Sequence, residues 1–188
     1  MTDPPARQIA ERVREQQGLL LAVARDLSAE QFAASPGPHA PAIRFHLWHI
    51  ARWADIVQAN LAVAGAGSAR GPATEIWADE RLARAWGLGG VELGYRESGM
   101  GLPDEAAHAL PLPDQATVLA YAERAFAAAA SASAAVDDAR FVAACRDPLG
   151  RETTVGGAIL NHLLHVGRHL GMIEALRGIL GLPGTATR

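Results

Sequence analysis

Residues 161–177 read NHLLHVGRHLGMIEALR and carry three histidines, spaced three and then four residues apart. Successive residues of an α-helix turn by about 100° and rise by about 1.5 Å, so His162, His165 and His169 share one face. His162 and His169 would lie about 10 Å apart along the axis, whereas a metal ion holds imidazole nitrogens at about 2.0–2.1 Å. One ion can therefore use His162 with His165, or His165 with His169. The second pair has the i, i+4 spacing of helical zinc-binding histidines.

A second histidine pair lies in FHLWHIARW at 45–53, where His46 and His49 are three residues apart. Helix bundles commonly build metal sites from side chains that point inward from facing helices. This pair can supply the third ligand that the later helix lacks. The competing interpretation is that these histidines are surface residues, or core residues hydrogen-bonded to their neighbours. Spacing alone leaves both interpretations open.

The remaining sequence is helical in pattern, because apolar residues recur at steps of three, four and seven. This periodicity predicts four long helices, over residues 5–33, 41–64, 114–136 and 154–180. Pro41 and Gly65 are suitable residues for the start and end of the second helix, and Thr153 or Thr154 can cap the last.

The segment between the second and third long helices has a different character. Residues 74–86 predict one shorter helix with Thr74 as its N-cap, and residues 87–113, rich in glycine and proline, predict an irregular crossover. Strand signals are almost absent. The sequence therefore predicts an all-α fold, a four-helix bundle with a short extra helix and a long crossover connection, in a single domain over residues 1–188.

Composition limits the possible partners. The chain has 188 residues, 49% hydrophobic and 20% charged, with a net charge of -3. No basic run is interleaved with aromatic residues, so nucleic acid is not expected as a partner. No apolar stretch is long enough for a signal peptide or a membrane span, and the single cysteine suits a reducing compartment. We expect a cytoplasmic protein with no membrane association.

The two histidine blocks together resemble a known family. FHLWHIARW at 45–53 and HVGRHLGMIEALRGILG at 165–181 are similar to the conserved blocks of the DinB-like superfamily of four-helix-bundle proteins. The resemblance implies that His49, His165 and His169 hold a divalent metal ion. It leaves His46 and His162 as candidates for a supporting or substrate-binding role.

The resemblance also implies a chemistry. The superfamily includes thiol S-transferases and a mycothiol-dependent maleylpyruvate isomerase, so the expected activity is that of a thiol S-transferase, or of a thiol-dependent hydrolase or isomerase. It would act on a small-molecule substrate through a metal-bound thiolate or water. The ion would be zinc, nickel or iron, and a low-molecular-weight thiol would be the cosubstrate. Arg52, three residues after His49, is a candidate for binding substrate, whereas Arg168 is expected to point away from the ligands.

A non-catalytic alternative remains. The metal can instead stabilise the bundle or be sensed by it, and many members of the resembled family have no assigned activity. Dimers are common among these proteins, and the alanine-rich helix over residues 114–136 can pack closely against a second copy. A homodimer is therefore expected, and a dimeric interaction protein is one form of the alternative.

Overall fold

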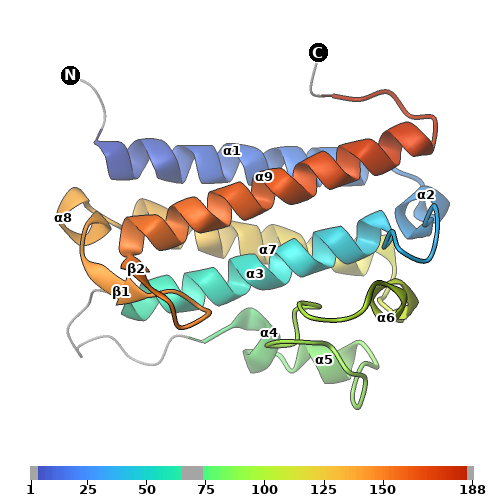
Figure 1. Ribbon diagram of the computed structural model, residues 1–188, viewed down its shortest axis with the longest axis horizontal. Coiled ribbons are helices and arrows are strands. Elements are labelled where there is room, and N and C mark those ends of the chain that lie inside the picture. Colours follow the sequence, from blue (N-terminus) through green and yellow to red (C-terminus); the bar gives the residue numbers. More distant parts are fainter. Residues whose placement is uncertain (1–3, 65–73, 186–188) are drawn as a thin grey trace.

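Four long helices form the body of the protein (Figure 1). The computed structural model describes residues 4–64 and 74–185. α1 and α3 each pack against both α7 and α9, and α1 and α9 run opposite to α3 and α7. The long helices are α1 (Pro5–Arg25), α3 (Ile43–Val63), α7 (Gln115–Ala134) and α9 (Val155–Ile179). The predicted all-α four-helix bundle is confirmed.

The most enclosed of these helices is α3. It is buried at 16 of its 21 residues, because α7, α9 and the crossover surround it. Trp48, in the first third of this helix, has no solvent exposure and packs against Trp77 of the crossover, with ring centroids 6.1 Å apart. A helix buried on nearly every side must satisfy its polar side chains internally. Specific partners hold the four buried charged or imidazole side chains of α3, which are His46, His49, Arg52 and Asp55.

The predicted long crossover is present and runs from the end of α3 back along the bundle to the start of α7 (Figure 1). It contains α4 (Ile76–Asp79), α5 (Leu82–Ala85) and α6 (Asp104–Ala109). The prediction of one helix over 74–86 is wrong, because Arg81 adopts a left-handed conformation (φ 52°) between α4 and α5. Thr74 does not cap α4, which begins after Glu75 without a side-chain cap. Gly65, the predicted end of the second helix, lies outside the described residues.

The first predicted helix, over residues 5–33, is also divided. α1 ends at Arg25, and α2 (Ala29–Ala33) restarts with Ser28 as its N-cap. The Ser28 hydroxyl accepts a hydrogen bond from the backbone N–H of Gln31, and the Gln31 side chain accepts one from the backbone N–H of Ser28. This capping box satisfies two otherwise free helix-end donors, which favours a new helix over continuation of α1.

Three small elements that the sequence pattern did not predict precede α9. α8 (Asp138–Phe141) is followed by β1 (Ala144–Arg146) and β2 (Glu152–Thr154), an antiparallel pair. β2 leads directly into α9, and the Thr154 hydroxyl accepts from the Gly157 N–H at 3.0 Å. The predicted Thr154 cap is confirmed. Within residues 4–64 and 74–185, no helix combines the length and the apolar character that crossing a bilayer requires.

Candidate metal centre

Three histidines from two helices meet inside the bundle. The Nε2 atom of His165 lies 3.2 Å from Nε2 of His49 and 3.1 Å from Nε2 of His169. The nitrogens of this group, which we call the histidine triad, all lie within 4.8 Å of one another. The structure thus brings together the i, i+4 pair of α9 and one histidine of α3, as the resemblance implied.

The His49 ring is oriented by the crossover. Its Nδ1–H donates to the Ser98 carbonyl at 2.6 Å, which leaves the lone pair of Nε2 facing the triad. The turn that presents this carbonyl requires Gly99, whose φ is +84°. A Cβ at this position would lie 2.9 Å from the rings of Phe45 and Trp48. The backbone therefore approaches α3 closely enough to fix the tautomer of His49.

His46 supports His169 from the opposite side. The Nδ1 atoms of these two buried rings are 3.1 Å apart. His46 also donates a hydrogen bond to the Pro41 carbonyl, so its second nitrogen is free to accept the Nδ1–H of His169. This arrangement leaves Nε2 of His169 unprotonated toward the triad. Histidine ligands usually donate their other N–H to such a partner.

Burial keeps these imidazoles neutral. It lowers the pKa of His49 to about 3, with a further contribution from His165, and lowers the pKa of His165 to about 4. The pKa of His169 is lowered further, first by burial and then by His49 and His165. Neutral imidazole is the form that binds metal ions. Three unprotonated nitrogens are therefore available at neutral pH.

The triad has the dimensions of a metal site. Nitrogens bound at about 2.0–2.1 Å to a tetrahedral ion are about 3.3–3.4 Å apart, close to the 3.1 and 3.2 Å separations seen here. The nitrogens of His49 and His169 already direct lone pairs inward, and a single proton on His165 can satisfy only one of them. A cation at the centre would satisfy all three, so these residues could hold a metal ion.

His162 lies outside the triad and faces α1. Its Nε2 accepts a hydrogen bond from the Gln17 side-chain amide at 3.2 Å, and burial lowers its pKa to about 3. Its Nδ1 and the Gln17 Oε1 are both buried and have no hydrogen-bond partner within residues 4–64 and 74–185. The structure therefore separates His162 from the ligands by the turn of helix that the spacing predicted.

Arg52 is occupied by protein partners. It is 1% exposed and donates to Asp55, Tyr121 and Glu75 and to the carbonyls of Arg96 and Glu97. The Arg52 guanidinium also lies 4.9 Å from the centroid of the Trp77 ring. These bonds anchor the crossover turn that presents the Ser98 carbonyl to His49. Arg52 acts here on the position of the turn, and its predicted contact with substrate stays a prediction.

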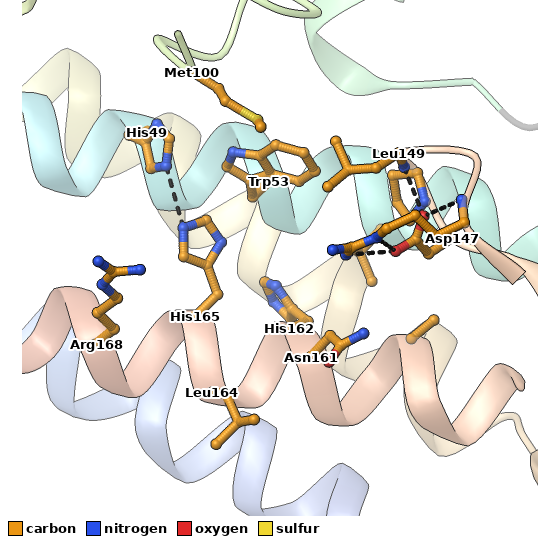
Figure 2. A pocket seen from close by; sticks show the side chains of 14 residues that line it. His49, Trp53, Met100, Asp147, Leu149, Asn161, His162, Leu164, His165 and Arg168 are labelled. Atoms are coloured by element: carbon orange, nitrogen blue, oxygen red, sulfur yellow. Dashed lines mark hydrogen bonds and ion pairs between the residues drawn. The ribbon is translucent and has the colours of Figure 1, made fainter. Parts of the chain in front are cut away.

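Two cavities flank the triad and share His49, His165 and Arg168. The first, which we call the Trp53 cavity, measures about 450 Å³ and lies between α3, α9 and the β1–β2 turn (Figure 2). The second, which we call the Phe45 cavity, measures about 650 Å³ and extends toward α6. Two members of the triad, His49 and His165, therefore form a wall common to both cavities.

Sequence reasoning missed two residues of this site. Arg168 does not point away from the triad as expected, because it borders both cavities, of which Figure 2 shows the Trp53 cavity. Trp53 borders the Trp53 cavity, with its ring centroid 5.7 Å from that of His165. Helical spacing contained the signal, since Arg168 follows His165 by three residues and Trp53 follows His49 by four.

Comparison with known proteins assigns the family. A sequence model of the DinB superfamily matches residues 12–173, a span that includes the whole triad. The chain belongs to the DinB superfamily. None of the curated proteins matches it.

The architecture of this DinB-superfamily protein is shared with a solved structure. A crystal structure of a conserved protein of Enterococcus faecalis superposes with a TM-score of 0.75 at 11% sequence identity. The match covers 96% of this chain and 99% of that one. At this identity the likeness supports the fold alone.

Proposed function

We propose that His49, His165 and His169 bind a divalent metal ion through their Nε2 atoms. The observation that carries this proposal is the convergence of three Nε2 atoms, two pairs of them 3.1 and 3.2 Å apart, from two helices. Support comes from the Ser98 carbonyl, which directs the His49 lone pair inward, and from burial, which keeps the rings neutral. Imidazole ligands suit zinc, nickel and iron.

We further propose that the protein is a metal-dependent thiol S-transferase, or a thiol-dependent hydrolase or isomerase. A divalent ion with three imidazole ligands supplies an open coordination position at which the pKa of a thiol or water is lowered toward neutrality. Neutral ligands leave the charge of the ion undiminished. Asp55, the nearest carboxylate on α3, faces Arg52 and Tyr121 instead of the triad.

Surrounding residues support chemistry on a small molecule. Both flanking cavities fall in the volume range of small-molecule sites, which is about 300–1,000 Å³. The apolar side chains of Trp53 and Val57 line one side of the Trp53 cavity and would favour the apolar body of a thiol or electrophile there. Two cavities on one triad suit a reaction with a thiol and a second substrate.

Metal analysis tests the site. Purified wild type and His49→Ala, His165→Ala and His169→Ala variants would be loaded with zinc, desalted and analysed by mass spectrometry. His108→Ala is a matched control, because this histidine is exposed on α6 and borders neither cavity. We expect stoichiometric zinc in wild type and control and its loss in the three variants. Equal metal content in all five proteins would refute the ligand assignment.

Turnover tests the activity. Metal-loaded wild type would be assayed with glutathione, bacillithiol or mycothiol and an electrophile such as monochlorobimane. We expect conjugation that chelation and His165→Ala both abolish and His108→Ala retains.

The same geometry supports a second candidate, a bundle stabilised by its metal, because the ligands join two helices that are far apart in sequence. Stoichiometric zinc with no turnover across a broad panel of thiols and electrophiles would favour this non-catalytic protein.

A further inference from the structure

The guanidinium of Arg168 has no partner at the edge of the triad. Arg168 is exposed and makes no hydrogen bond or ion pair with the residues in 4–64 and 74–185. It lies on α9 between His165 and His169, and Figure 2 shows its side chain rising toward the Trp53 cavity. After burial, the charge of Arg168 is the next cause of the lowered pKa of His165, which places this charge within electrostatic reach of the triad.

The Trp53 cavity combines an apolar wall with a neutralised acid. Trp53, Val57 and Met100 contribute apolar surface on the side of α3 and the crossover. Asp147, the one carboxylate among its lining residues, is bound by Arg151 through Nη2 at 2.6 Å and Nε at 2.7 Å. Arg168 therefore contributes the uncompensated charge at this cavity, and that charge is positive.

The Phe45 cavity, which Arg168 also borders, carries a negative charge at its rim. The exposed carboxylate of Asp104 borders it and lies 3.9 Å from Nδ1 of His39, and no arginine or lysine among the described residues pairs with it. A negative charge there would repel a second anion. The charge distribution thus favours the Trp53 cavity over the Phe45 cavity as the site for an anionic ligand.

We propose that the Trp53 cavity binds an organic carboxylate whose apolar body lies against Trp53 and Met100 and whose carboxylate pairs with Arg168. A guanidinium offers two parallel donors that match a carboxylate, and such charge-assisted bonds are about twice as strong as neutral ones. Arg168, His49 and His165 border the same cavity, so the ligand would lie beside the proposed metal site. The inference deepens the proposed function and rests on it, since it names the substrate class of that site.

A charged and a neutral probe together test whether Arg168 binds the carboxylate. Zinc-loaded protein would be titrated by calorimetry with 4-phenylbutyrate and with its neutral counterpart 4-phenyl-1-butanol. We expect Arg168→Gln to weaken phenylbutyrate binding about tenfold or more and to change butanol binding less than twofold. Arg12→Gln is the matched control, because Arg12 is exposed and pairs with Glu15 on α1. No binding of phenylbutyrate by wild type, or equal binding by wild type and Arg168→Gln, would overturn the inference.

A pair of methionine variants tests which of the two cavities binds the ligand. Met100 borders only the Trp53 cavity and Met172 only the Phe45 cavity, and the two are exposed to similar extents, 39% and 36%. We expect Met100→Gln to weaken phenylbutyrate binding about threefold or more, because a polar amide of similar length replaces apolar contact, and Met172→Gln to leave it unchanged. The reverse pattern would place the ligand in the Phe45 cavity and contradict the inference.

Titration of chelator-treated protein separates this inference from the proposed metal site. If Arg168 is the anchor, the effect of Arg168→Gln persists without metal, and it remains measurable even if wild type binds no zinc. If chelation removes phenylbutyrate binding and Arg168→Gln has no effect, the carboxylate binds the ion, and the role of Arg168 is refuted.

Discussion

Replacing Arg52 with glutamine should lower the free energy of unfolding more than a substitution at an exposed residue does. The guanidinium lies within hydrogen-bonding distance of Asp55 at 3.2 Å, Tyr121 at 3.1 Å and Glu75 at 2.8 Å. Breaking a buried ion pair by removing one partner costs about 3–5 kcal/mol, because the other charge stays buried. Asp55 would retain the N–H groups of Ile76 and Trp77, both at 2.9 Å. We therefore expect the free energy of unfolding to fall by an amount near the lower limit of this range, about 3 kcal/mol.

Urea unfolding of the metal-free protein, followed by circular dichroism at 222 nm, measures this loss. Arg124→Gln is the matched control, because Arg124 forms a half-exposed surface pair with Glu80 and should cost at most about 1 kcal/mol. A loss for Arg52→Gln that is no larger than that of the control would refute the reasoning.

The same variant should affect the metal centre. Arg52 also donates to the carbonyls of Arg96 and Glu97, which precede the Ser98 carbonyl that orients His49. Loss of such a supporting partner typically lowers metal affinity about 10- to 100-fold. Competition with a zinc chelator would measure the change, and an unaltered affinity in a destabilised variant would show that the turn keeps its position without Arg52.

Three further changes test the surroundings of the triad. Gly99→Ala should destabilise the protein and weaken zinc binding, because the left-handed backbone at this position alone costs a non-glycine residue about 1–2 kcal/mol. Urea unfolding and zinc titration measure the two effects, and an unchanged stability and zinc affinity would contradict the argument. His46→Asn should lower zinc affinity about 10- to 100-fold without abolishing binding, and full affinity would show that His169 needs no such partner. In metal-free protein the contribution of His162 to stability is complete above pH 6.5 and is lost as the pH falls toward 3, since the unfolded chain binds a proton that the buried ring does not. His162→Leu should therefore reduce the slope of unfolding free energy against pH by up to about 1.4 kcal/mol per pH unit, and equal slopes in acid titrations of both proteins would contradict this.

Periodicity predicted the long helices well because each has an extended apolar face. α3, α7 and α9 begin within two residues of the predicted starts. The breaks were missed for local reasons. The capping box at Ser28 competes with an otherwise continuous apolar pattern, and the left-handed residue Arg81 has no signature of its own. The three-residue strands before α9 are too short for a detectable alternation.

The candidate site was only partly predictable. The spacing of His165 and His169 and the geometry of a helix limit which histidines can share an ion, but the choice of His49 as the third member came from the resemblance. The Ser98 carbonyl could not be predicted, because any residue carries a carbonyl and only the path of the crossover brings this one to the ring. The accessible position of Arg168 follows from its spacing and could have been recognised.

The distribution of the triad over the chain has a consequence for when the site can form during synthesis. His49 is made early, and His165 and His169 lie 116 and 120 residues later, on the last long helix described. A nascent chain that has not yet produced α9 holds one of the three imidazoles, too few to retain an ion. Metal loading would therefore follow the docking of α9 onto α3, so that bound metal marks a chain whose long-range packing is already complete.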